Sequence, residues 1–425
     1  MFSNNQKIFS LISLIIAGEI IFALPFHLAR FFRPTLLEVL NLTPTQLGTA
    51  QGIYGIVALL SYFPAGLLAD RFPTHKLLAI SLWTTAVGGI FLASLPGYQM
   101  LLALFAFFGI TTIMLFWGAL IRATREWGGT DNQGVAFGWL EGGRGLLAVS
   151  LASLGVLLFE WSFPDGYTNA TSIDKQNTFS NVIYGYTAIT AVTGIIVWFS
   201  LQKYTCSRNT VHNDNIPKHF YSSIKYVLSF PAVWWQAMIV LCAYVGYKGI
   251  DHISLYAVDI YHYDAIEAAK LVTLAAWIRP IAAISAGFIA DLINPIKLLG
   301  ISFGVLFISC LYFTLSTPSL DETWVFTANV LVTCTAVFAL RALYFAVFES
   351  YRLPLGVTGT AVGIISVIGF LPDIFVLYVA GRLIDEYPGL TGHQYFFLFL
   401  SVFAAIGLIS SLLLKYHQVQ LKHRS

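Results

Sequence analysis

A chain of 425 residues that is 57% hydrophobic and 10% charged, with a mean hydropathy of +0.75, cannot fold as a soluble domain. Soluble proteins carry roughly 25% charged residues, so most of this chain must face lipid or other buried helices. The net charge of +2 does not indicate a nucleic-acid partner. The sequence shows no nucleophile–base constellation, nucleotide loop or metal-ligand spacing, which argues against an enzyme and against a cofactor.

Apolar runs of about 20 residues are needed to cross a bilayer. The first run is too long for a signal peptide and leads directly into a second span. In chain order the expected spans are 8–29, 46–68, 77–96, 99–121, 135–159, 180–201, 231–257, 266–290, 297–316, 324–347, 357–380 and 393–414. The sequence therefore predicts an all-α polytopic membrane protein with twelve transmembrane helices.

Lys and Arg sort to one side of these spans. The inner segments carry Lys7, Arg71, Lys76, Arg122, Arg125, Lys203, Arg208, Lys218, Lys225, Lys297, Arg352, Lys415, Lys422 and Arg424. The outer segments carry Arg30, Arg33, Lys175 and Arg382. By the positive-inside rule, both termini are expected in the cytoplasm.

Domain boundaries follow from the longest polar segment. Residues 202–229 read as a cytoplasmic linker, because the segment is too short for a folded domain of its own. This predicts an N-terminal six-helix bundle at 1–201 and a C-terminal six-helix bundle at 230–425.

A charged turn recurs at half the chain length. Gly66-Leu67-Leu68-Ala69-Asp70 is echoed by Gly287-Phe288-Ile289-Ala290-Asp291, and Lys76 by Lys297, 221 residues later in each case. Such repetition indicates two structurally similar halves.

The residues of these turns are expected to act in gating. Gly66 and Gly287 would let helices approach closely, and Arg71 and Lys76 would stay in the cytoplasm. Asp70 and Asp291 can face the positive N-terminal end of a helix in the other half, around 356–360 and 131–134 respectively. In the fifth span Glu141 and Arg144 (i, i+3) form either a cytoplasmic gate element or a local ion pair.

Ionisable groups inside a bilayer are costly, so each is a functional hypothesis. We expect them to face an interior cavity between the halves or to pair with one another. Counted from the span ends, they are Glu19, Glu141, Arg144, Lys248, Asp251, His252, Arg279, Arg341 and Asp373.

The first and seventh spans hold the most informative of these groups. Glu19 lies near mid-span, and Arg30 returns to nearly the same helix face about 16 Å further out. Glu19 is either a proton-coupling or substrate-contacting acid or a buried packing acid, and Arg30 can simply snorkel. Lys248 can contact Asp251 or His252 on its own helix, as a structural pair or as an anion contact.

Three further charges complete the candidate binding set. Arg279 precedes a mid-span Pro280, which permits a bend. Arg341 lies deep in the tenth span, and neither arginine has an acid within reach on its own helix. Asp373 is a candidate partner for a cation on another helix, such as Lys248.

The turn at 66–76 resembles the loop 2–3 signature of the major facilitator superfamily, and 287–297 resembles its degenerate copy in loop 8–9. The stretch 42–48 also resembles the entry to that family's second helix, and the likeness spans essentially the whole chain. It departs at 73–75, where Pro-Thr-His replaces a common Gly-Arg pair. The resemblance implies two pseudo-symmetric six-helix bundles, and one such chain could work alone as a monomer.

Within that family, 248–256, 277–280 and 357–373 look like a bacterial branch related to organophosphate–phosphate antiporters, which implies an inner (plasma) membrane protein. Those antiporters hold phosphate with one arginine on the first helix and one on the seventh. Here His27 and Lys248 come closest to these positions, with Arg30 a turn away, so the arginine pair is not reproduced.

The embedded cations outnumber the embedded acids, which favours a small anionic metabolite as substrate, and a mid-membrane acid suits proton coupling. Two alternatives stay open. A neutral or zwitterionic solute, such as an amino acid or sugar, would fit if Lys248, Arg279 and Arg341 are paired with Asp251, Asp373 and Glu19. A sensor built on a transporter fold is less favoured, because no signalling domain is attached.

Overall fold

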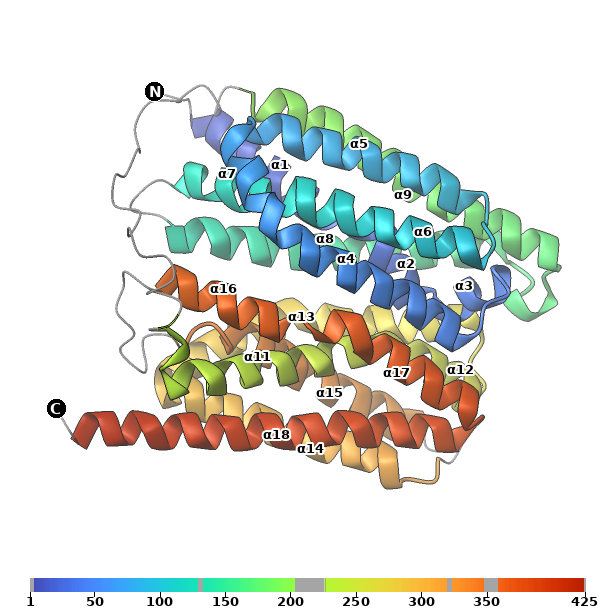
Figure 1. Cartoon of the computed structure of the whole chain (residues 1–425). Coiled ribbons are helices and arrows are strands. Elements are labelled where there is room, and N and C mark those ends of the chain that lie inside the picture. Colours follow the sequence, from blue (N-terminus) through green and yellow to red (C-terminus); the bar gives the residue numbers. More distant parts are fainter. Residues whose placement is uncertain are drawn as a thin grey trace. The chain divides into compact units, whose positions relative to one another are not determined.

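The expected spans fold as helices in the computed structural model, which describes residues 4–128, 133–202, 225, 227–318, 323–347 and 358–423 (Figure 1). All elements within these residues are helical, as the sequence predicts. Ten helices in the described part are long and apolar enough to cross a membrane. The predicted linker at 202–229 lies mostly outside the described residues.

The chain divides into two units. Unit 1 comprises Met1–Asn209 and His262–Thr273, and unit 2 comprises Thr210–Tyr261 and Leu274–Ser425. The helices of unit 1 are α1 (Asn4–Ile20), η1 (Ala23–His27), α2 (Leu28–Phe31), α3 (Arg33–Val39), α4 (Pro44–Arg71), α5 (Thr74–Ala93), α6 (Tyr98–Gly109), η2 (Ile110–Trp117), α7 (Gly118–Gly128), α8 (Gln133–Ser162), η3 (Tyr167–Asn169) and α9 (Ser172–Ser200).

Unit 2 contains the remaining helices, and α13 begins in the part of the chain assigned to unit 1. They are α11 (Pro231–Gly249), η5 (Ile250–His252), α12 (Ile253–Tyr261), α13 (Ala265–Ile293), α14 (Pro295–Leu315), α15 (Thr323–Leu343), α16 (Thr358–Gly369), α17 (Pro372–Glu386) and α18 (Leu390–His423).

Local sequence signals set several of the helix starts. Thr43 opens α4 with a capping box, in which its hydroxyl accepts from the Gln46 backbone N–H and the Gln46 side chain accepts from the Thr43 backbone N–H. Proline occupies the first turn of α4, α11, α14 and α17, where a missing backbone N–H costs nothing. Apolar packing then holds the helices together.

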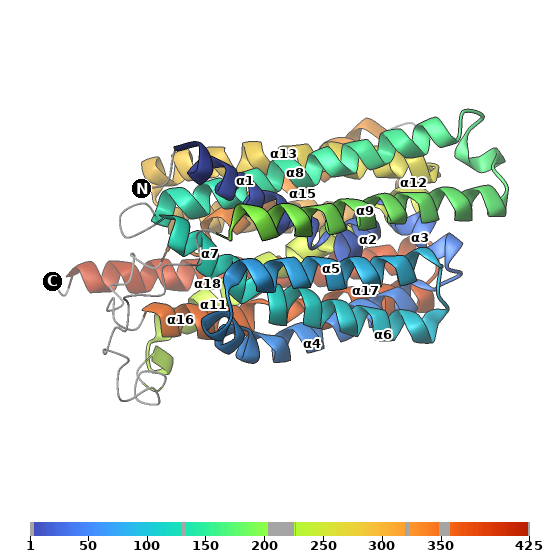
Figure 2. The ribbon, with the colours of Figure 1, turned by 90° about the horizontal axis from the view of Figure 1, so that it is seen from above.

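Helices α5 and α9 illustrate that packing in unit 1, where they run side by side (Figures 1 and 2). The indole of Trp83 lies directly against Gly194, and its N–H donates to the carbonyl of Ala191 at 3.2 Å. Any side chain at position 194 would collide with the ring, so glycine permits this close contact. In unit 2, α14 and α18 pack in the same way, with Phe303 against Gly407.

The first expected span is not one regular helix. Helix α1 ends at Ile20, a turn follows, and the wide π-helical turn η1 contains Pro25. The expectation that Glu19 and Arg30 share one face of a continuous α-helix is therefore wrong. Proline, which lacks a backbone N–H, accounts for the interruption.

Candidate functional site

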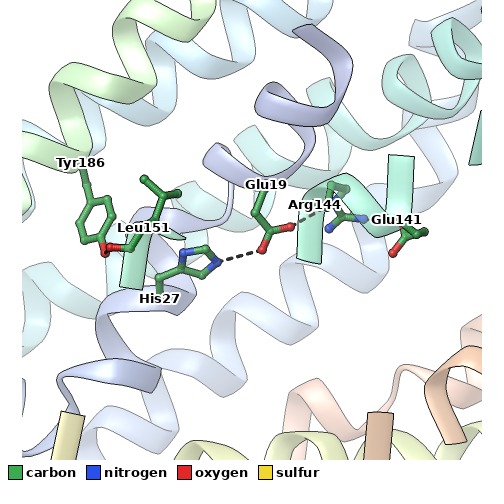
Figure 3. A network of polar contacts seen from close by, with 6 residues as sticks. All are labelled: Glu19, His27, Glu141, Arg144, Leu151 and Tyr186. Atoms are coloured by element: carbon green, nitrogen blue, oxygen red, sulfur yellow. Dashed lines mark hydrogen bonds and ion pairs between the residues drawn. The ribbon is translucent and has the colours of Figure 1, made fainter. Parts of the chain in front are cut away.

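The carboxylate of Glu19 lies at the centre of a buried ion-pair network in unit 1 (Figure 3). Its Oε1 is 3.1 Å from Nε2 of His27, and its Oε2 is 3.2 Å from Nε of Arg144. Glu19 and His27 are each only 4% exposed. The carboxylate is thus held by one permanent cation and one base that can gain or lose a proton.

The interruption of the first span brings Glu19 and His27 together. Eight residues of regular α-helix would separate their backbones by about 12 Å and turn them to different faces. The turn after Ile20 and the π-helical turn Ala23–His27 change that geometry. As a result, two residues of one span contact each other across its bend.

Arg144, on α8, extends the network away from the buried acid. Its Nη1 lies 2.6 Å from Oε1 of Glu141, whose side chain is 53% exposed, whereas the Glu19 side chain is 5% exposed. Its guanidinium carbon also lies 5.7 Å from the ring centroid of Phe22 and 5.8 Å from that of Trp117. One guanidinium therefore joins a buried carboxylate to an exposed one, with aromatic rings beside it.

A second network lies in unit 2, around Asp373 at the start of α17. Lys248 Nζ is 2.9 Å from Asp373 Oδ1, and the Tyr244 hydroxyl donates to Asp373 Oδ2 at 3.0 Å. Lys248 Nζ lies 4.0 Å from Asp251 Oδ2, the outer limit of an ion pair. The stronger partner of Lys248 is thus the acid 125 residues further on, and its neighbour on the same span is the weaker one.

Arg341, on α15, lies against tyrosine rings. Its guanidinium carbon is 3.8 Å from the ring centroid of Tyr247 and 5.9 Å from that of Tyr244. A ring face attracts a cation but does not neutralise its charge, as a carboxylate does. The contact places Arg341 near the Lys248–Asp373 pair, since Tyr244 contacts both the arginine and Asp373.

The remaining predicted binding residues fall into less distinctive places. Arg30, on α2, and Arg279, on α13, are half-buried. Among the described residues, Arg279 contacts no carboxylate within ion-pair distance. His252 is buried in η5 with its ring 4.9 Å from that of Phe396, and Asp251 is buried beside it.

The predicted gating residues are placed only in part. Arg71 and Lys76 are exposed at the α4–α5 turn. The structure does not describe the side chains of Asp70 and Asp291, nor those of their expected partners around 356–360 and 131–134. A Cβ added at Gly66 or Gly287 would meet no described atom within 4 Å, so the close helix approach expected there is not found in this part of the chain.

Several residues of the two networks were not singled out as site residues from the sequence. They are His27, Phe22, Trp117, Tyr244 and Tyr247. Pro25 lies between Glu19 and His27 and indicates a helix interruption, which could bring the two side chains together. The rings carry no such signal, because aromatic residues are common throughout the chain. In the residues the structure covers, no group of three metal-ligating side chains gathers.

Comparison with known proteins identifies related chains. A protein-family model described as Major Facilitator Superfamily matches residues 15–376. Inner membrane protein YihN of Escherichia coli (strain K12) is 27% identical over 416 residues, which cover 97% of this chain and 95% of that protein. Inner membrane protein YqcE of the same organism is 26% identical over 389 residues, covering 90% and 88%.

Solved structures share the architecture. A bacterial homologue of the human lysosomal transporter Spinster, in an inward-facing and unoccupied conformation, has a TM-score of 0.78 at 14% identity and covers 99% of both chains. The nucleoside transporter NupG has a TM-score of 0.68 at 13% identity, covering 96% of this chain and 98% of that one. At 13–14% sequence identity, this structural similarity shows a common fold and no more.

Proposed function

Since it belongs to the major facilitator superfamily of membrane transporters, we propose that this protein moves a small organic anion across the membrane by alternating access, driven by coupled protons. Membership of that family makes it a transporter and not an enzyme. The bilayer and a small-molecule substrate are its partners. The names of its relatives and the distribution of Lys and Arg support a bacterial inner membrane location with both termini cytoplasmic.

The observation that carries the coupling proposal is the Glu19–His27 contact. A buried acid beside a base is an arrangement that can take up and release a proton, and such groups inside membranes commonly mark proton pathways. His27 Nδ1 is buried and accepts or donates no hydrogen bond within the described residues. The imidazole can therefore hold a proton there while its Nε2–H still donates to Glu19.

The charge balance supports an anionic substrate. Of the predicted binding residues in unit 2, three are permanent cations (Lys248, Arg279 and Arg341) and two are acids (Asp251 and Asp373), which leaves an excess of one positive charge. Arg341 lies against the rings of Tyr247 and Tyr244. These arginines would attract an organic anion electrostatically, whereas they would not attract a neutral solute.

Transport by purified protein in liposomes tests the coupling. A panel of carboxylates, phosphate esters, amino acids, sugars and nucleosides is first screened by thermal shift, and the best ligand is then used as radiolabelled tracer. We expect uptake against the tracer gradient when the outside is acid, and its loss in Glu19→Gln. Tracer exchange without a pH gradient should persist in that variant. Glu386→Gln, which removes a carboxylate of an exposed ion pair, is the matched control.

Uptake that ignores the pH gradient in the wild type, or that is unchanged in Glu19→Gln, would contradict proton coupling. If only uncharged ligands shift the thermal midpoint, the anion assignment fails while transport itself stands.

A zwitterionic substrate, such as an amino acid, is the second candidate. The Lys248–Asp373 pair favours it, because a carboxylate and an ammonium side by side could each bind the opposite charge of one solute. The two candidates differ in their response to Asp373→Asn. Binding of an amino acid would weaken in this variant, whereas binding of a simple carboxylate would strengthen as Lys248 loses its partner.

A further inference from the structure

The guanidinium of Arg144 is shared between two carboxylates of unequal environment. Its Nε lies 3.2 Å from buried Glu19, and its Nη1 lies 2.6 Å from exposed Glu141 (Figure 3). Building on the proton-carrying role proposed above for Glu19, we propose that Arg144 binds the anionic group of the substrate, a carboxylate or phosphate, when Glu19 becomes protonated.

The electrostatic reason is the change in charge around one arginine. With Glu19 ionised, the guanidinium faces two negative carboxylates and has no electrostatic demand for a third anion. Protonating Glu19 removes one of the two charges, and the arginine then attracts an anion in its place. Arg–carboxylate and Arg–phosphate hydrogen bonds are strong and frequently bidentate. The oxygen atoms of the substrate can therefore accept hydrogen bonds from the guanidinium N–H groups that the ionised Glu19 attracted before.

Aromatic rings keep the arginine in position for this exchange. Phe22 and Trp117 lie 5.7 and 5.8 Å from the guanidinium carbon, and their own centroids are 6.3 Å apart. Cation–π attraction does not depend on the protonation of Glu19. Arg144 can thus stay beside Glu19 after protonation removes the charge of that carboxylate. An arginine side chain held by carboxylates alone could move away.

Linkage then makes the exchange a coupling device. If protonation of Glu19 raises the affinity for the anion, the bound anion must favour protonated Glu19 by the same factor. Proton and anion would therefore bind together and be released together, as symport of the two requires.

The other ionisable groups near Glu19 leave this assignment intact. His27 faces it from η1, and Glu141 reaches it through Arg144. On α9, the Tyr186 hydroxyl donates to the carbonyl of Leu151 at 3.4 Å.

Arginine-specific labelling tests the proposal without knowledge of the natural substrate. Purified protein is treated with phenylglyoxal at fixed pH, and the adduct at Arg144 is quantified by mass spectrometry relative to that at exposed Arg382. We expect Glu19→Gln, which mimics the protonated acid, to raise the labelling rate of Arg144 at least fivefold. Glu160→Gln, which removes an exposed carboxylate at the other end of α8, should leave the rate unchanged.

Acetate and inorganic phosphate then serve as anion probes, with acetamide as the uncharged control. We expect both anions to protect Arg144 at concentrations at least fivefold lower in Glu19→Gln than in the wild type, and acetamide to protect neither. Equal labelling in the two proteins, or equal or absent protection by the anions, would overturn the role of Arg144. Such a result would not bear on proton-driven uptake, which is measured separately. Conversely, a protein that shows the expected labelling of Arg144 but no gradient-driven uptake would contradict the proposed transport function and not the role of Arg144.

Discussion

Glu19 and His27 stand eight residues apart in one membrane span, yet their side chains meet at 3.1 Å because the helix between them is interrupted. The contact bridges the bend formed by the turn after Ile20 and the π-helical turn that contains Pro25. A single short stretch of sequence therefore builds both the bend and the acid–base pair that crosses it.

Replacing His27 tests whether this pair carries protons. His27→Gln keeps a hydrogen-bond donor for Glu19 but cannot bind a proton. Losing a positioned proton-transfer group typically costs a rate factor on the order of 100 or more, so we expect the initial rate of gradient-driven uptake to fall about 100-fold. His417→Gln, near the end of α18, should transport at the wild-type rate. Normal gradient-driven uptake by His27→Gln would exclude the imidazole from the proton pathway.

The Lys248–Asp373 pair should behave as a buried ion pair. Removing one member leaves the other charge uncompensated, so Lys248→Met alone and Asp373→Asn alone should each lower the free energy of unfolding by about 2–4 kcal/mol. The expected loss is below that of a fully buried pair, because the Asp373 side chain is partly exposed. The double variant should recover at least half of that loss. Equilibrium unfolding in mixed detergent micelles measures all three.

A matched surface pair provides the reference for that cycle. Arg382 and Glu386 form an exposed i, i+4 pair on the same helix, α17, as Asp373. Removing either should leave stability unchanged. Strictly additive losses in the Lys248/Asp373 double variant would show that the two residues do not interact.

The tyrosine ring beneath Arg341 is expected to matter for substrate affinity, because it holds the guanidinium in place. Tyr247→Leu removes a cation–π contact worth about 0.5–2 kcal/mol, so KM for the anion should rise about 2- to 30-fold. Tyr247→Phe keeps the ring and should retain the wild-type KM. If both variants lose affinity equally, the hydroxyl and not the ring face is the important group.

A pH-dependent effect is expected at the outer loop. Burial, and then the hydrogen bond that its hydroxyl donates to Glu38 at 2.7 Å, raise the pKa of Tyr167 above its ordinary value of about 10. A group whose pKa is raised on folding stabilises the protein fully below that ordinary value, and the stabilisation is lost as the pH rises beyond it.

Tyr167→Phe should therefore be less stable than the wild type at pH 7.5, by about 0.5–1.5 kcal/mol for one hydrogen bond. The difference should narrow as the pH is raised above about 10, where the wild type alone loses this contribution. Unfolding measured at several pH values gives the comparison. Tyr184→Phe, an exposed tyrosine on α9, should show no such narrowing. A constant difference across the series would mean that the Tyr167 hydroxyl does not titrate differently in the two states.

Local properties of the sequence were sufficient for the helices. Apolar runs long enough for a bilayer predicted each span, and the caps at Thr43 and Thr171 and the prolines in first turns start helices where such signals are expected. These signals act within a few residues, so they can be read from the sequence alone. The i, i+3 pair Glu141–Arg144 is of the same kind, because helical spacing brings its members together.

The interruption of the first span shows where local reading reaches its limit. Regular helical spacing placed Glu19 and Arg30 on one stripe, but the bend at Pro25 turned His27 towards Glu19 instead. A proline indicates that a break can occur. Its direction depends on the helices that pack against it.

Thus the amino-acid order by itself determined that this is a many-spanning helical membrane protein with costly charges at particular depths, since hydrophobicity and helical period are local quantities. Only the tertiary structure decided which charge meets which: Arg144 with Glu19, and Lys248 with Asp373 more closely than with its neighbour Asp251. Buried charges must find partners, but the partners available depend on which helices adjoin, and that is settled by packing along the whole length of each unit.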